Sequence, residues 1–143
     1  MFNKIFFVIL VDQITKAVFS SRDFFFGPIK IYLKKNFGLP FGIEIENTFS
    51  ILIVTLILFY FIFYFVRNKS ELNYFEATGF SLVFGGAISN LVDRLTLGYV
   101  RDFLDVSLWS VFNFADVAIA TGLLLIVFGK IFQKHFESGK VIK

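Results

Sequence analysis

An apolar run from Phe49 to Val66 is the feature that most constrains how this chain can fold. As a helix it would be about 27 Å long, which is close to the thickness of the hydrocarbon core of a bilayer. It ends at Arg67 and Lys69, in a chain of 143 residues that is 57% hydrophobic and contains 23 Phe. Because an ordinary soluble domain is far less apolar, these properties predict an integral membrane protein.

Three further segments have the length and apolar character of membrane helices. The first starts with Lys4 ahead of an apolar run, but Asp12 and Lys16 interrupt it before a small-residue cleavage site, so we expect an uncleaved helix. The third contains Gly79 and Gly85, which let helices approach closely. The sequence therefore predicts one domain, 1–143, built as an integral membrane all-α bundle of four transmembrane helices at about 2–19, 49–66, 74–91 and 113–132.

Between the first two spans, at about 29–47, the pattern changes to that of a small β-hairpin. Residues 29–34 and 43–46 alternate between apolar and polar side chains, and turn-forming residues separate them. We expect the apolar face of this hairpin to rest on the bilayer or on the helices, because an isolated hairpin is only marginally stable.

Most of the polar residues that are costly to place in a membrane are gathered between Phe84 and Ile119. The set comprises Asn90, Asp93, Arg94, Asp102, Asp105, Asn113 and Asp116. The first three would share one face of the third helix, and the last two open the fourth. Repeated Asp and Asn side chains at one bilayer level favour a functional site.

Asp12 and Lys16 are four residues apart and would lie on one face of the first helix. Each charge at mid-bilayer costs about 2.5–3.5 kcal/mol, so both should face protein or water. An ion pair that fixes helix packing and a catalytic role are both open at this point.

Asp102 and Asp116 can meet only if the loop at 106–111 folds back over the end of the bundle. Asn113 can then cap the last helix, with Asp116 in its first turn. Two carboxyl groups in a poorly hydrated site share one proton, so that one can accept a proton from water while the other protonates a carbonyl oxygen. This pair predicts amide hydrolysis that needs no Ser, Cys, His or metal ion.

Asp93 is interpreted differently because Arg94 follows it directly. We expect the guanidinium to keep this carboxylate ionised, so that the pair orients a loop or binds a carbonyl or an anionic headgroup. Asp105 has no such neighbour and is expected to be solvated. Trp109, in the same loop, fits an anchor at the membrane interface.

The amino-acid composition excludes some catalytic groups, metal sites and binding partners. The chain has no Cys and a single His, His135, which excludes a thiolate nucleophile and leaves no His or Cys metal site. The net charge of +3 comes from Lys and Arg residues that flank apolar segments, so we expect contact with membrane lipid and no nucleic-acid partner.

Four ordered motifs together extend over nearly the whole chain: DQITK at 12–16, GGAISNLVDR at 85–94, VRDF at 100–103 and FNFAD at 112–116. They resemble those of the bacterial lipoprotein signal peptidases (signal peptidase II). The corresponding family patterns are D-Q-x-[ST]-K, G-G-A-x-G-N-x-x-D-R, V-x-D-F and F-N-x-A-D.

By this resemblance Asp102 and Asp116 are the catalytic dyad of an aspartyl endopeptidase without metal or cofactor. Residues that bind substrate or support the dyad are Asp12, Lys16, Asn36, Asn90, Asp93, Arg94 and Asn113. The implied substrate is a prolipoprotein with a diacylglyceryl-modified cysteine, cut just before that cysteine. The resemblance also implies inhibition by globomycin-type cyclic peptides.

The implied location is the bacterial cytoplasmic (inner) membrane, with both termini in the cytoplasm and a small extracytoplasmic sheet that cradles the substrate. An even number of spans places the termini on one side, but the positive charges that flank the spans are too evenly divided to say which.

The chain departs from the family pattern at two places. Ser89 stands where the family usually has Gly, and Leu39-Pro40 replace small residues in a loop motif, N-x-G-[AS]-[AS]-[FW], that Asn36, Gly38 and Phe41 fit.

Two other functions compete with the peptidase. Clustered Asp and Asn side chains could hold Mg²⁺ in a metal-dependent membrane lipid phosphotransferase, although no Gly-rich phosphate loop is evident. A small transporter or assembly factor could use Asp12 and Lys16 as an ion relay, but would leave Asp102 in its loop unexplained.

Overall fold

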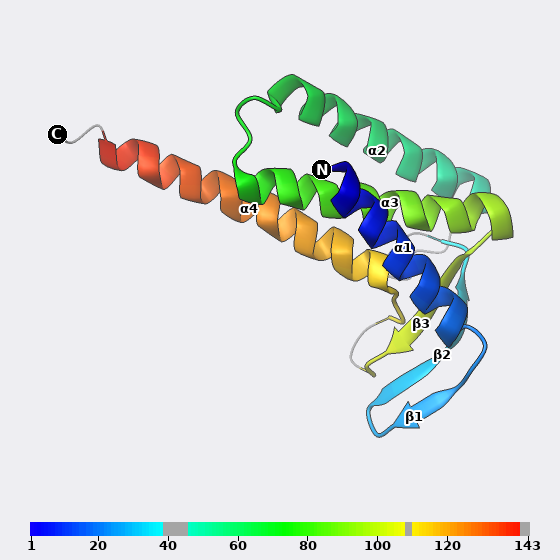
Figure 1. Cartoon of the computed structure of the whole chain (residues 1–143). Coiled ribbons are helices and arrows are strands. Elements are labelled where there is room, and N and C mark those ends of the chain that lie inside the picture. The colour runs from blue at the N-terminus through cyan, green and yellow to red at the C-terminus, as the bar shows by residue number, and fades with distance from the viewer. Residues whose placement is uncertain (39–45, 108–109, 141–143) are drawn as a thin grey trace.

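The computed structural model describes residues 1–38, 46–107 and 110–140. The elements follow in the order α1 (Phe2–Phe19), β1 (Phe24–Phe26), β2 (Ile29–Asn36), α2 (Asn47–Asn68), α3 (Tyr74–Leu97), β3 (Val100–Asp105) and α4 (Phe114–Lys140). Figure 1 shows the sheet at one end of the helices and the connection between α2 and α3 at the other end.

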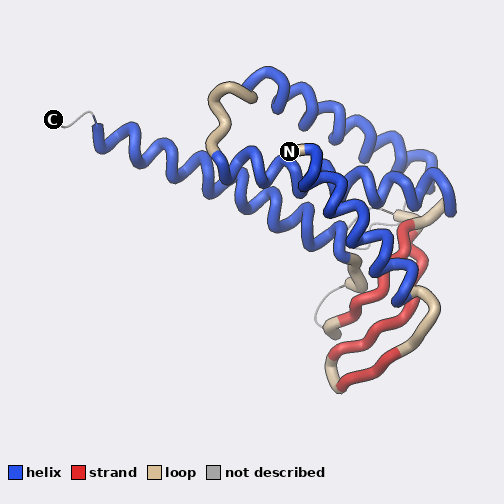
Figure 2. Tube along the Cα trace, in the orientation of Figure 1, coloured by secondary structure: helices blue, strands red, loops and turns tan. Residues whose placement is uncertain are grey.

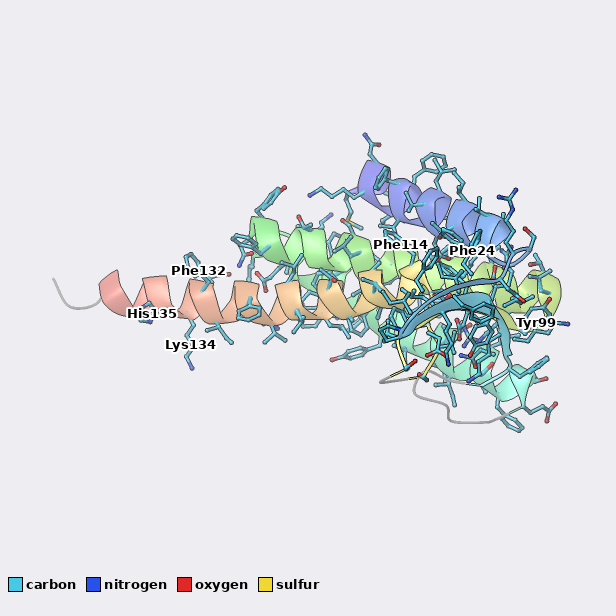
Figure 3. The ribbon with its side chains drawn as sticks, turned by 90° about the horizontal axis from the view of Figure 1, so that it is seen from below. Phe24, Tyr99, Phe114, Phe132, Lys134 and His135 are labelled. Carbon is cyan, nitrogen blue, oxygen red and sulfur yellow. The ribbon has the colours of Figure 1, made fainter. Side chains whose placement is uncertain are left out.

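Within the described residues, three helices are long and apolar enough to cross a membrane: Thr48–Asn68, Tyr74–Leu97 and Phe114–His135. Their outward faces carry large exposed apolar side chains, of which Phe132 near the far end of α4 is labelled in Figure 3. Three of the four predicted spans therefore have the character of membrane helices. The 18-residue α1 contains three charged residues, Lys4, Asp12 and Lys16, and its membrane crossing stays a prediction.

Helix α3 is the centre of the helical part and packs against each of the other three helices. It approaches α4 most closely at glycines, because a Cβ atom on Gly79 would lie 2.5 Å from the Gly122 carbonyl oxygen. One on Gly86 would lie 2.5 Å from the Ala115 carbonyl oxygen. The predicted role of small residues in this helix, close packing, is confirmed.

Helices α3 and α4 extend beyond the segments predicted as membrane spans. Helix α3 continues past 91 to Leu97 because Asn90, Asp93 and Arg94 are buried against protein rather than exposed to lipid. It then stops at Gly98, whose φ of +82° is a left-handed cap that glycine adopts without strain. Helix α4 likewise extends beyond 132, to Lys140. The membrane spans were predicted from apolar content, so they end before the two helices do.

The sheet has three antiparallel strands in the order β1-β2-β3 (Figure 2). The predicted first hairpin arm is β2, but its partners are β1 and β3, which the alternation pattern did not predict. Strand β1 is three consecutive Phe residues, too short to show a period of two, and β3 comes from the polar stretch after α3. The predicted second arm falls largely on residues 39–45, and Trp109 on 108–109, which lie outside the described residues.

The sheet is fixed to the ends of the helices. Strand β3 packs against α1 and α3, and the Phe103 ring stacks on Phe19 at the end of α1 with 5.2 Å between ring centroids. On β3 the side chains of Val100, Asp102 and Leu104 share one face, because a strand alternates. Val100 and Asp102 are buried, so this face of the sheet is directed into the molecule.

Candidate active site

Asp102 and Asp116 lie where the sheet meets the start of α4. Asp102 is 1% exposed on β3, and Asp116 is in the first turn of α4. The expected cap is present, because the Asn113 side chain accepts from Asp116 N–H (3.0 Å) and Asp116 Oδ2 accepts from Asn113 N–H (3.2 Å). This reciprocal pair fixes both side chains at the helix start.

Three amide side chains hold the two carboxyl groups. Asn36 Nδ2 donates to Asp102 Oδ2 (2.9 Å), and Asn113 Nδ2 donates to Asp102 Oδ1 (2.6 Å). Asn90 Nδ2 donates to Asp116 Oδ1 (2.9 Å). Each carboxyl group is therefore oriented by two hydrogen bonds, from residues of three different segments of the chain.

Burial raises the pKa of the Asp102 carboxyl from its ordinary value to about 7, and the negative charge of Asp116 adds to this rise. The hydrogen bonds from Asn36 and Asn113 act in the opposite direction. A carboxyl group with a pKa near 7 can both hold and release a proton at neutral pH, as acid–base catalysis requires.

Asn36 is itself held in place. Its Oδ1 accepts from Gly38 N–H (3.0 Å), and Arg94 Nη2 donates to the Gly38 carbonyl oxygen (2.8 Å). The guanidinium of Arg94 thus fixes the backbone that carries the Asp102 partner. The departure from the family motif at Leu39-Pro40 begins just after this anchored segment and lies outside the described residues.

Asp93 and Arg94 do not pair with each other as predicted, although Arg94 binds a carbonyl group, that of Gly38, as expected for this pair. Consecutive residues on a helix point in different directions, and Asp93 binds Arg101 instead, through Arg101 Nη2 (2.8 Å), Nε (3.2 Å) and backbone N–H (3.0 Å). Since Arg101 directly precedes Asp102, the carboxylate of Asp93 fixes the backbone just before Asp102, one of the two candidate catalytic residues.

Asp12 likewise fixes the backbone just before Asp116, the other candidate catalytic residue. Its Oδ1 accepts from Ala115 N–H (2.7 Å), one residue before Asp116. Lys16 joins the two supports, with its ammonium 2.7 Å from Asp12 Oδ2 and 3.3 Å from Asp93 Oδ2. Lys16 also donates to Asn90 Oδ1 (2.8 Å). The ion pair of Asp12 with Lys16 is confirmed, and it reaches the site through Asn90 and Ala115.

Three residues of this network, Gln13, Ser89 and Arg101, were not among the predicted site residues. Gln13 donates to Ser89 Oγ (2.9 Å) and to Asp93 Oδ1 (3.0 Å) and accepts from Arg101 (2.7 Å). Ser89, which stands where the family usually has Gly, donates its hydroxyl to Asp12 Oδ2 (2.7 Å). All three lie within the motifs that resemble the family, and this was the sequence signal that could have found them.

Asp105 lies apart from the two candidates. It accepts from Tyr32 Oη (3.2 Å) and from Ser107 N–H (2.7 Å), so it supports the sheet and the turn after it rather than being merely solvated. Within the described residues no group of three or more His, Cys, Asp or Glu side chains is arranged to hold a metal ion.

Two largely apolar cavities reach the carboxyl groups. One, of about 190 Å³, lies between α2, α3 and α4 and ends at Asn90, Arg94 and Asp116. The other, of about 490 Å³, touches both Asp102 and Asp116 and extends along α4. Asn36 and Asp116 line both cavities, whereas Asp102 lines the larger one.

Comparison with known proteins identifies this arrangement. The family model described as signal peptidase (SPase) II matches residues 4–132. A lipoprotein signal peptidase of Fusobacterium nucleatum is 34% identical over 142 residues, covering 87% of this chain and 82% of the relative. One from Caldicellulosiruptor bescii is 38% identical over 125 residues, covering 83% and 82%. The chain belongs to the signal peptidase II family.

A solved bacterial membrane enzyme, determined at 2.3 Å, superposes with a TM-score of 0.79 at 28% identity and covers 93% of this chain and 88% of its own. As a signal peptidase II, the chain is a bacterial membrane protease of lipoprotein processing. The expected resemblance is thus confirmed, and the remaining questions concern which residues act and how.

In this signal peptidase II, Lys16→Gln should be strongly destabilising, because it leaves Asp12 and Asp93 buried without their shared ammonium. Removing one partner of a buried ion pair costs about 3–5 kcal/mol. We expect a lower unfolding temperature in lipid nanodiscs for this variant. Lys69→Gln, on an exposed side chain, is the matched control. Unchanged unfolding of Lys16→Gln would contradict a structural role for the ammonium.

Proposed function

We propose that this chain is an aspartyl endopeptidase that removes the signal peptide from diacylglyceryl-modified prolipoproteins, with Asp102 and Asp116 as its catalytic pair. The observation that carries the proposal is that both carboxyl groups line one largely apolar cavity and that each is held by two hydrogen bonds. A lipid-modified substrate could present its scissile bond there while its acyl chains stay in apolar surroundings.

The chemistry needs one proton shared between the two carboxyl groups. Asp102 holds it near neutral pH, while Asp116 accepts a proton from a water molecule whose oxygen attacks the scissile carbonyl carbon. The proton of Asp102 passes to the carbonyl oxygen, which gives a tetrahedral diol. When the diol collapses, one of its hydroxyl groups returns a proton to Asp102, and the carbon–nitrogen bond breaks. The amine leaves with the proton that Asp116 took from water, so the pair again holds one shared proton.

The other predicted residues act through this pair. Asn36, Asn90 and Asn113 orient the carboxyl groups directly. Arg94 acts through Gly38 and Asn36, and Asp12, Lys16 and Asp93 act through the backbone next to each aspartate. All of them are positioning residues, and they belong to one domain, 1–143. A globomycin-type cyclic peptide would compete with the substrate for the two cavities.

For the membrane arrangement we propose four crossings, with α1 as the first. Its two fully buried charges face protein, so its lipid-facing surface is apolar. Both termini would then lie in the cytoplasm of a bacterial cell, with the sheet and the carboxyl pair on the extracytoplasmic side of the inner membrane.

Asp102→Asn and Asp116→Asn should each abolish cleavage of a diacylglyceryl-modified prolipoprotein, because Asn keeps the volume but cannot transfer the proton. The double variant should be little worse than either single one, since groups that act as a unit are non-additive. Asp105→Asn, on the same strand as Asp102, is the matched control and should keep activity. Strong cleavage by either single variant, or loss of wild-type activity in EDTA that Mg²⁺ restores, would refute the metal-free pair.

The raised pKa of Asp102 predicts how stability varies with pH. Between pH 4 and 7 the folded chain holds a proton on Asp102 that the unfolded chain has released, so the free energy of unfolding should fall as the pH rises through this window. Asp102→Asn should flatten this fall, and Asp105→Asn should not. Thermal unfolding at several pH values measures both slopes. Parallel curves for wild type and Asp102→Asn would contradict the pKa near 7.

Single cysteines can test the orientation, because the chain has none of its own. Ser107 lies beside the sheet and Ser70 lies between α2 and α3, at the opposite end of the helices, and both are exposed. A membrane-impermeant maleimide should label Ser107→Cys in intact spheroplasts, and Ser70→Cys only after the membrane is permeabilised. The reverse pattern would place the sheet in the cytoplasm.

A further inference from the structure

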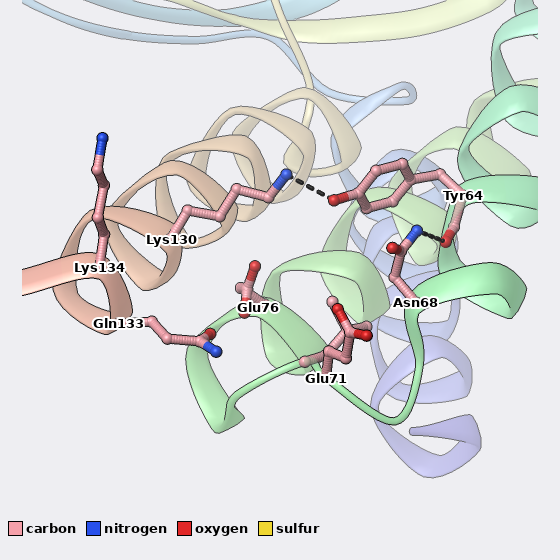
Figure 4. Close-up of a pocket in the computed structure, with 8 residues that line it drawn as sticks. Tyr64, Asn68, Glu71, Glu76, Lys130, Gln133 and Lys134 are labelled. Atoms are coloured by element: carbon pink, nitrogen blue, oxygen red, sulfur yellow. Dashed lines mark hydrogen bonds between the residues drawn. The ribbon is translucent and has the colours of Figure 1, made fainter. Parts of the chain in front are cut away.

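A polar pocket, distinct from the two apolar cavities, lies at the end of the helices opposite the sheet. Figure 4 shows it in close-up. Its volume is about 210 Å³, and it lies where the end of α2, the connection to α3, the first turn of α3 and the outer part of α4 meet. Glu76 in this pocket and Asn90 in the candidate active site are about 21 Å apart along α3. The pocket is therefore separate from the catalytic chemistry.

The pocket joins α2 to α4. Lys130 Nζ donates to Tyr64 Oη (2.6 Å) and lies 4.7 Å from the centre of the Tyr64 ring (Figure 4). An ammonium group has three N–H donors, and the hydrogen bond to Tyr64 uses one of them. Lys130 can hold Tyr64 and still donate to a ligand.

The floor of the pocket is rigid. Glu76 is 3% exposed, and its carboxylate accepts from Asn73 N–H (3.1 Å) in the capping box of α3. Asn73 Nδ2 donates to the Gly129 carbonyl oxygen of α4 (2.9 Å), and a Cβ atom on Gly129 would lie 2.7 Å from Glu76 Cγ. The start of α3 is thus packed tightly against α4.

Opposite charges line the pocket from different elements. Lys130 and Lys134 come from α4, whereas Glu71 and Glu76 come from the α2–α3 connection and the start of α3. Their formal charges cancel, so a simple anion or a simple cation would meet repulsion as well as attraction. A zwitterion with a phosphate for the lysines and an ammonium for the glutamates satisfies all four groups.

The surroundings of the pocket point to a lipid rather than a soluble zwitterion. The pocket lies at the ends of Thr48–Asn68 and Phe114–His135 and at the start of Tyr74–Leu97, the three helices that can cross a membrane. One turn deeper on the same helix faces, Tyr60 is 65% and Val127 54% exposed. Acyl chains would lie along these side chains while the headgroup occupies the pocket, in the manner of headgroup sites between membrane helices.

We propose that this pocket binds the headgroup of an aminophospholipid, with the phosphate on Lys130 and Lys134 and the ammonium on Glu71 and Glu76. The bound lipid bridges α2 and α4 beside the Tyr64 contact. It thereby stabilises the wall of the 190 Å³ cavity between α2, α3 and α4. This proposal goes beyond peptide cleavage and does not depend on it.

The test is lipid binding by the full-length protein in detergent micelles, with native mass spectrometry to count retained lipid and thermal unfolding to measure stabilisation. Dioleoylphosphatidylethanolamine should bind in a saturable 1:1 complex and raise the unfolding temperature. Dioleoylphosphatidylglycerol, which has no ammonium, should bind about tenfold more weakly. Glu71→Gln and Lys134→Gln, both at exposed side chains, should each weaken binding of phosphatidylethanolamine about tenfold, as the loss of one charged hydrogen bond predicts.

Matched controls are Glu46→Gln and Lys69→Gln, exposed residues that do not line the pocket, and both should bind lipid as the wild type does. Equal retention of phosphatidylethanolamine by all variants would overturn the proposal. Retention of phosphatidylglycerol as strong as that of phosphatidylethanolamine would overturn the role of the glutamates. Equal affinity for glycerophosphoethanolamine, which has no acyl chains, would overturn the assignment to a membrane lipid.

Discussion

The burial of one ammonium group between two carboxylates is the interaction on which the rest of the structure depends. Lys16 lies 2.7 Å from Asp12 and 3.3 Å from Asp93, and none of the three is exposed beyond 1%. Buried charges of this kind are costly unless every partner is present. Here Arg101 supplies the second positive charge, and Gln13 and Ser89 supply the remaining hydrogen bonds. The cluster is therefore balanced, and it joins α1, α3 and β3 at the end of the helices where the two candidate aspartates lie.

The same cluster explains why both candidates reach Asn113 although 14 positions separate them in the sequence. Asp93 holds the backbone N–H just before Asp102, and Asp12 holds the backbone N–H just before Asp116. Each aspartate is thus placed by a carboxylate from another helix, and Lys16 fixes the distance between those two carboxylates. Asn90 adds a third link, because its amide accepts from Lys16 and donates to Asp116. Positions on three helices and one strand are in this way reduced to one rigid unit.

Much of this arrangement could be predicted from the sequence, and the parts that could not share a physical cause. Long apolar runs identified α2, α3 and α4, and the spacing of Asn113 and Asp116 identified the helix cap. Sequence spacing reports neighbours along one helix, so it paired Asp12 with Lys16 correctly. It also suggested Arg94 as the partner of Asp93, whereas the partner, Arg101, reaches Asp93 only after Gly98 reverses the chain. Strand β1 could not be predicted for another reason. Its three Phe residues show no alternation of apolar and polar side chains, and only pairing with β2 makes them a strand.

The apolar walls around the carboxyl groups have two consequences that cannot be varied separately. They fit the lipid-modified substrate of a signal peptidase II, because the cavities beside Asp116 are lined mainly by aliphatic and aromatic side chains of α2 and α4. They also remove water from Asp102, and this desolvation is the main cause of its pKa near 7. A more polar wall would weaken the apolar contacts and lower that pKa together. The proposed cleavage beside an acyl-modified cysteine and the proposed use of a proton-bearing carboxyl group at neutral pH therefore require the same surroundings, which is why two aspartates would suit the catalytic role.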